Sequence, residues 1–171
     1  FIINHMKENY LQEDFMVVSP DVGSANRARY FALNFHKDMA IIDKVRNYSV
    51  TSTVEEVKLV GEVKDKNVFI GDDMIDTGGT IISACKLLKD KGAKDIYVAC
   101  TLPFFNGAAI ERFEKAYSEG IIKKIIGTDA VFHGEDFIRS HEWYDEISIS
   151  NLIASVIYNI NHKLSLSDLL I

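Results

Sequence analysis

The chain has 171 residues, of which 47% are apolar, and a formal net charge of −6. This length suits one compact domain, and the acidic charge argues against a nucleic-acid partner, because no basic stripe is available to neutralise backbone phosphates. No stretch approaches the roughly 20 uninterrupted apolar residues that a membrane span needs, and the N-terminus lacks the pattern of a signal peptide. We therefore expect a cytoplasmic protein without a membrane partner.

Short apolar strands alternate with helices along the chain. The first strand is expected over residues 15–19, where Pro20 ends it, and a helix with one apolar face follows over residues 23–35. Further strands are expected over residues 40–42, 57–63, 67–71, 96–100 and 124–126, and further helices over residues 80–90, 106–117 and 150–162. This alternation predicts an α/β fold, a parallel sheet with helices on both faces, whose ligands bind beyond the carboxyl ends of the strands.

The most informative segment is residues 72–80, which joins the strand at 67–71 to the helix that follows. It combines carboxylates, glycines and threonines: Asp72, Asp73, Asp76, Thr77, Gly78, Gly79 and Thr80. A phosphate at a helix N-terminus is held by free backbone N–H groups and by the helix dipole, and glycines let the chain approach it closely. Two adjacent carboxylates are costly unless they meet hydrogen-bond donors or a cation, and ribose hydroxyls are such donors. The segment therefore predicts a ribose 5-phosphate site.

A simpler explanation of the same segment is a tight turn beside a solvated strand end. That explanation would suffice for a lone pair of glycines. It does not account for the acidic pair, the third aspartate and both threonines in a strand-to-helix context, so we favour the binding site.

The chain also resembles a known family. Residues 68–80 are similar to the phosphoribosyl-pyrophosphate motif of type I phosphoribosyltransferases, in the wording found in ribose-phosphate pyrophosphokinases. Residues 18–23 resemble the opening of the C-terminal domain of that family, and residues 40–46 resemble the stem of its catalytic loop. The likeness runs from about Val17 onward. It implies that residues 1–171 form the phosphoribosyltransferase-like catalytic domain, without the N-terminal domain that the family also has.

The resemblance also implies roles for single residues. Lys44 and Arg46 match the lysine and arginine of the loop that closes over the reaction centre, and Arg46 is also expected to contact ribose 5-phosphate. Asp72 matches the ribose-binding aspartate, beside the loop 76–80 that surrounds the 5-phosphate. Asp21 matches a magnesium-associated aspartate, so Mg²⁺ is the implied cofactor.

The implied reaction moves the diphosphoryl group of ATP to the anomeric hydroxyl of ribose 5-phosphate, in a homo-oligomeric enzyme. Two alternatives stay open. A nucleobase phosphoribosyltransferase would share the phosphate site but would not need the loop of Lys44 and Arg46. A catalytically silent regulatory subunit would explain Ser24, where the family usually has a second glycine, and Val45, which interrupts a run of three basic residues.

Overall fold

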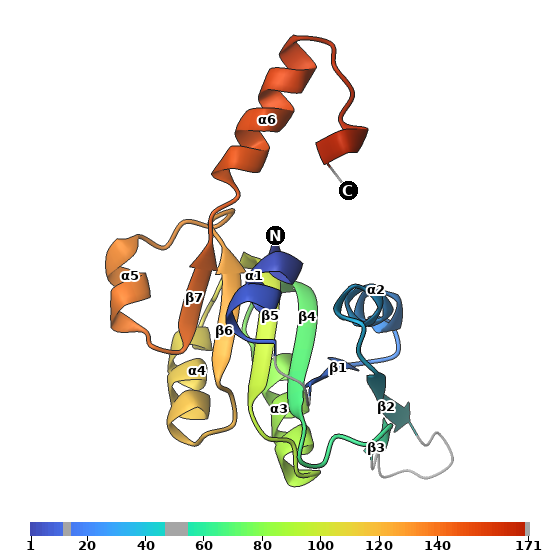
Figure 1. Ribbon diagram of the computed structural model, residues 1–171. Helices are drawn as coiled ribbons and strands as arrows, with labels where there is room; N and C mark the ends of the chain where they lie inside the picture. Colours follow the sequence, from blue (N-terminus) through green and yellow to red (C-terminus); the bar gives the residue numbers. More distant parts are fainter. Residues whose placement is uncertain (12–14, 47–54, 170–171) are drawn as a thin grey trace.

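The computed structural model of the chain describes residues 1–11, 15–46 and 55–169, and for residues 44–46, 55, 56 and 168 it describes the backbone alone. The strands are β1 (Phe15–Ser19), β2 (Met39–Arg46), β3 (Glu55–Val60), β4 (Asn67–Ile75), β5 (Ile96–Pro103), β6 (Lys124–Thr128) and β7 (Tyr144–Ile147). The helices are α1 (Ile2–Asn9), α2 (Ala25–Phe35), α3 (Gly79–Asp90), α4 (Ala109–Ser118), α5 (Glu135–Ser140) and α6 (Ser150–Asn161), with a 3-10 turn over Ser167–Leu169 (Figure 1).

Within the described residues the strands form one sheet, in the order β3-β2-β1-β4-β5-β6-β7. Neighbouring strands are parallel except for β2 and β3, which pair antiparallel. The chain changes direction across the sheet at β1, because β2 lies on one side of β1 and β4 on the other. Ligands of open α/β sheets bind at such a switch point. The register, with Val17 opposite Phe69, places the end of β1 next to Asp72 of β4.

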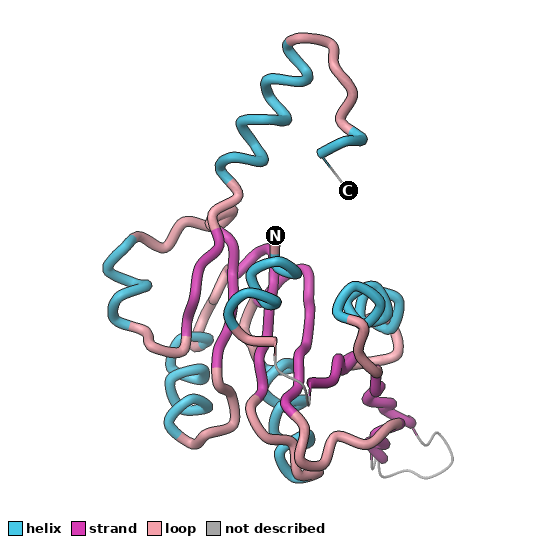
Figure 2. The backbone as a smooth tube through the Cα atoms, in the orientation of Figure 1, coloured by secondary structure: helices cyan, strands magenta, loops and turns pink. Residues whose placement is uncertain are grey.

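Two apolar cores lie on opposite faces of the sheet, because successive side chains of a strand point to opposite sides. Phe15 and Val17 of β1 pack in the core beneath α1 and α2, whereas Met16 and Val18 pack in the core beneath α3 and α4. Figure 2 shows α1 in front of the strands and α3 behind them. The predicted α/β fold with helices on both faces is confirmed, and among the described strands β3 alone pairs antiparallel.

The elements differ from the predicted ones mainly at their ends. β4 continues four residues beyond Gly71, and β2 continues to Arg46 because β3 pairs with it. The helices α1 and α5 and the strand β7 were not predicted, since they are short and lack a long apolar period. The buried face predicted for α2 is confirmed, with Ala28, Phe31, Ala32 and Phe35 all in the core.

The last long helix, α6, extends away from the sheet (Figure 1). All of its residues are described, and none is buried. Ile153, Ile157, Tyr158 and Ile160 are each at least 48% exposed. No helix in the described part of the chain is long and apolar enough to cross a membrane.

Candidate functional site

The segment predicted to bind a sugar phosphate surrounds a cavity where β4 meets α3. The cavity has a volume of about 300 Å³. It is lined by Asp72, Met74, Ile75, Asp76, Thr77, Gly78, Gly79, Thr80 and Ile81. The structure therefore brings the predicted residues 72 and 76–80 together around one space. Asp73 does not line this cavity.

Gly78 shapes the end of the cavity nearest α3. It precedes α3 with φ of 73°, in the left-handed region that favours glycine. A Cβ at this position would also lie 2.4 Å from Cζ of the buried Phe113. No side chain caps the start of α3, so the first N–H groups of this helix can serve an anion.

The loop between β5 and α4 supports the other side of the cavity. The Asn106 side-chain amide donates to Asp76 Oδ1 at 2.7 Å, and its backbone N–H donates to the Asp76 carbonyl at 3.0 Å. Arg112 of α4 donates to the Thr77 carbonyl oxygen at 2.8 Å. Both residues were missed in the sequence, because nothing local to residues 106 and 112 indicates a contact some 30 residues upstream. Residues 76 and 77 are therefore held in place by a neighbouring element.

The acidic pair at the end of β4 faces an arginine of α2. Arg27 donates through Nη1 to Asp72 Oδ1, and its Nη2 lies 3.1 Å from Asp73 Oδ2. Asp72 Oδ1 also accepts the Asp73 backbone N–H at 2.9 Å. The Asp72 side chain is 22% exposed and that of Asp73 is 60% exposed. Arg27 was not predicted as part of the site.

The two carboxyl groups of this pair have different acid strengths. Burial, and then the interaction with the Asp73 carboxyl group, raises the pKa of Asp72, while the charge of Arg27 opposes the rise. The interaction with the Asp72 carboxyl group and the charge of Arg27 lower the pKa of Asp73. Of the two carboxyl groups, Asp72 depends more on a hydrogen-bond donor or a cation to stay negatively charged.

Asp21 lies in the turn between β1 and α2. Its Oδ1 accepts the Ser24 backbone N–H at 2.7 Å, and its carbonyl oxygen accepts the Ser19 hydroxyl at 2.7 Å. The carboxylate therefore fixes the start of α2 with one oxygen and keeps the second oxygen for another partner.

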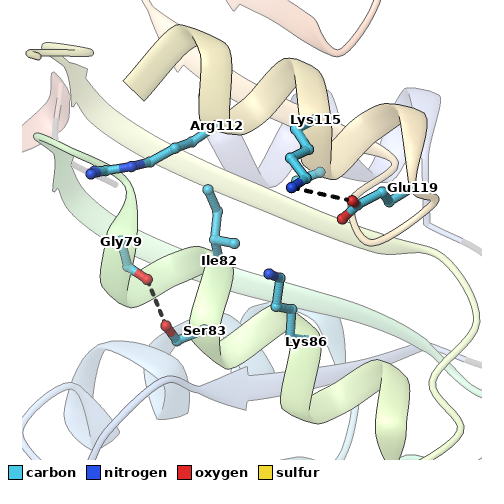
Figure 3. A pocket seen from close by; sticks show the side chains of 8 residues that line it. Gly79, Ile82, Ser83, Lys86, Arg112, Lys115 and Glu119 are labelled. Atoms are coloured by element: carbon cyan, nitrogen blue, oxygen red, sulfur yellow. Dashed lines mark hydrogen bonds and ion pairs between the residues drawn. The ribbon is translucent and has the colours of Figure 1, made fainter. Parts of the chain in front are cut away.

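A second cavity, of about 330 Å³, lies between α3 and α4 beside the phosphate loop. It is lined by Gly79, Ile82, Ser83, Lys86, Arg112, Lys115, Ala116 and Glu119 (Figure 3). Lys115 pairs with Glu119 at 3.7 Å, and Ser83 donates to the Gly79 carbonyl at 2.9 Å. Gly79 lines both cavities, so the two spaces are separated only by the first turn of α3.

The family of phosphoribosyl transferase domains matches residues 1–135. The chain belongs to this family. The ribose-phosphate pyrophosphokinase of Chlorobaculum tepidum is 38% identical over 168 residues, which are 98% of this chain and 49% of that protein. The ribose-phosphate pyrophosphokinase of Mycoplasma pneumoniae is 43% identical over 120 residues, which are 70% of this chain and 36% of that protein.

A solved structure agrees with these matches. The crystal structure of phosphoribosylpyrophosphate synthetase from Mycobacterium smegmatis has a TM-score of 0.80 to this phosphoribosyl transferase domain, at 32% identity. The similarity covers 95% of this chain and 50% of that one. The predicted resemblance to ribose-phosphate pyrophosphokinases is confirmed. The chain spans about half the length of the curated relatives it matches.

The predicted loop residues of this phosphoribosyl transferase domain are placed by their backbone alone. Lys44 and Arg46 lie in β2, three and five residues beyond Ile41, which pairs with Ser19 at the end of β1. Both residues therefore lie toward the carboxyl-end edge of the sheet, as the acidic pair does. Their side chains, and the polar stretch 47–54, lie outside the described residues.

The carboxylates of this phosphoribosyl transferase domain fit Mg²⁺ only in part. Among the residues whose side chains the structure describes, no group of three or more His, Cys, Asp or Glu could hold a metal ion. Mg²⁺ is commonly held by one or two carboxylates together with waters and substrate phosphates. Asp21, in the turn after β1, suits that mode of binding, because its carboxylate uses one oxygen for the Ser24 N–H group.

Proposed function

We propose that this domain binds ribose 5-phosphate and serves the synthesis of phosphoribosyl pyrophosphate. The proposed reaction transfers the diphosphoryl group of ATP to the anomeric hydroxyl of the sugar phosphate and releases AMP. The observation that carries the proposal is the cavity of residues 72–81, which has a carboxylate at one end and the uncapped start of α3 at the other. The names of the relatives support the same reaction.

In this proposal each end of the cavity binds one part of the sugar phosphate. Asp72 accepts hydrogen bonds from the ribose hydroxyls. The N–H groups at Gly79 and Thr80, with the Thr77 and Thr80 hydroxyls, hold the 5-phosphate. Asp73 and Asp76 contribute mainly by holding neighbouring side chains in place, because Asp73 contacts Arg27 and Asp76 contacts Asn106.

Transfer between two phosphate-bearing reactants depends on positioning and charge neutralisation more than on covalent help. Lys44 and Arg46 are proposed to supply positive charge at the transferred group, since the resemblance assigns them to the catalytic loop. Asp21 would hold Mg²⁺ together with waters and the substrate phosphates. Mg²⁺, when bound, would neutralise part of the polyphosphate charge.

The two alternative functions differ from this one in their products. A nucleobase phosphoribosyltransferase would release pyrophosphate only when a base is present. A silent regulatory subunit would bind ribose 5-phosphate without turnover. The names of the relatives favour the pyrophosphokinase reaction. Homo-oligomer formation stays a prediction from the resemblance, and a cytoplasmic location stays a prediction from the sequence.

The test is an assay of AMP formation from ATP and ribose 5-phosphate, made on the chain itself and on a longer protein that adds an N-terminal half. We expect negligible AMP from the chain alone, because the resemblance places the adenine site in the N-terminal domain, and AMP that depends on ribose 5-phosphate from the longer protein. Base-dependent pyrophosphate release would assign the first alternative. Sugar phosphate binding without either reaction in the longer protein would assign the second.

A further inference from the structure

Arg27 belongs to the segment that resembles the family, but the resemblance gives it no role, although it contacts both members of the acidic pair. Arg27 comes from the first turn of α2, whereas Asp72 and Asp73 lie near the end of β4, 45 and 46 residues later. One guanidinium group reaches both carboxylates, with Nη1 on Asp72 and Nη2 on Asp73. A rigid, planar fork can bridge two acceptors in this way, and the single ammonium group of a lysine cannot reproduce the geometry.

Packing in the core fixes where Arg27 can reach. Phe31 lies four residues after Arg27 and therefore on the same face of α2. Its ring fills the space above Gly71, where a Cβ would lie 2.3 Å from the Phe31 Cε2 atom. Because Gly71 lets α2 approach β4 so closely, the side chain one turn earlier reaches the two residues that follow in the strand, Asp72 and Asp73. The arginine is thus placed by the core and not by the loop.

The same contact determines which carboxylate oxygens remain for a ligand. Oδ1 of Asp72 accepts both Arg27 and the Asp73 N–H group, and Oδ1 of Asp73 accepts the Met74 N–H group at 3.0 Å. Oδ2 of Asp73 faces Arg27. These hydrogen bonds therefore leave Oδ2 of Asp72 available to a ligand. Asp72 is also the member of the pair that lines the cavity.

We propose that Arg27 is a positioning residue for ribose 5-phosphate. Its guanidinium group bridges Asp72 and Asp73, presents Oδ2 of Asp72 to the sugar hydroxyls, and takes the place that a divalent cation would otherwise occupy between the two carboxylates. The sugar part of this inference rests on the proposed function. The cation part does not, since it concerns only the acidic pair and its counter-charge.

Two opposite shifts in affinity follow. Arg27→Gln removes the bridge, so ribose 5-phosphate should bind about tenfold more weakly in the absence of divalent cations. The same variant removes the competing positive charge, so Mg²⁺ added alone should bind about threefold more tightly. Arg27→Lys keeps the charge but not the fork. It should therefore lose sugar affinity while its Mg²⁺ affinity stays within about twofold of the wild-type value.

Calorimetric titration measures both affinities in the same proteins. Arg29→Gln is the matched control, because Arg29 is an exposed arginine two residues along the same helix, and it should change neither affinity. Circular dichroism and thermal melting establish that each variant is folded. A folded Arg27→Gln variant with unchanged affinities overturns the inference, and so does one that binds both ligands more weakly, because a purely structural role would have that effect.

The experiment also separates this inference from the proposed function. If the wild-type chain fails to bind ribose 5-phosphate, the proposed function fails and the sugar part of the inference fails with it. The Mg²⁺ titration still decides whether Arg27 is the built-in counter-charge of the pair. If the wild-type chain binds the sugar phosphate and Arg27→Gln binds it equally well, only the inference about Arg27 fails.

Discussion

Replacement of Gly78 by alanine tests how the phosphate loop is held. The residue has φ of 73°, and its Cβ would lie 2.4 Å from Cζ of Phe113, a ring that is fully buried. The left-handed conformation costs a residue with a Cβ about 1–2 kcal/mol. Forcing an extra carbon into a packed core costs about 1–3 kcal/mol more. Gly78→Ala should therefore lower the free energy of unfolding by about 2–5 kcal/mol.

Gly79 provides the control for this prediction within the same loop. A Cβ there would meet nothing within 4 Å, so Gly79→Ala should leave the free energy of unfolding unchanged or raise it by up to about 1 kcal/mol. Urea unfolding followed by circular dichroism measures both variants. Equal stability of Gly78→Ala and the wild type, or an equal loss in both variants, would refute the reasoning.

Three further predictions concern the sugar site, the catalytic loop and the docking of α1. Asp72→Asn should weaken ribose 5-phosphate binding about tenfold in calorimetry without changing the fold, and unchanged affinity would remove Asp72 from the site. Lys44→Ala in a longer, active protein should lower kcat by about two to three orders of magnitude with a much smaller change in KM; a large rise in KM at normal kcat would make Lys44 a ground-state binding residue. Asp145→Asn should destabilise the fold by about 1–3 kcal/mol in urea unfolding at pH 7, because Asp145 Oδ2 accepts bonds from Tyr10 at 2.6 Å and from His5 at 2.7 Å. Burial opposes the ionisation of Asp145, but these bonds lower its pKa overall. The loss of stability in the variant should therefore be full above the unfolded pKa of about 3.9, and it should fade as the pH falls through the lower pKa of the folded state. A loss of stability that does not depend on pH would contradict this assignment.

The strand-to-helix turn at residues 72–80 could be predicted from the sequence because its parts are contiguous. Residues 72–80 run from a strand into a helix, so their types and order already carry the geometry of a strand end and a helix start. The buried face of α2 was predicted for a similar reason, since a period of 3.6 residues is visible within a single element. The structure confirms the strand-to-helix turn and the buried face of α2, with differences of a few residues at the ends of the elements. Phosphate binding by residues 76–80 stays a prediction.

The supporting contacts could not be predicted, because each joins elements far apart in the sequence. Arg27 reaches Asp72 only because Phe31 packs above Gly71. Asn106 holds Asp76 from the loop after β5. The helix α1 has no strong periodic pattern and is anchored instead by contacts from His5 and Tyr10 to β7, some 140 residues later. Distant pairings of this kind leave no local pattern in one sequence.

The central claim is that residues 72–80 bind ribose 5-phosphate. An amide NMR titration of the isotope-labelled chain tests it most directly, because each backbone N–H group reports on its own surroundings. Saturable shifts are expected for the amides of Gly79, Thr80 and Asp73 on addition of ribose 5-phosphate, and much smaller shifts with ribose. Absence of shifts at these amides, or saturable shifts confined to another part of the chain, would contradict it.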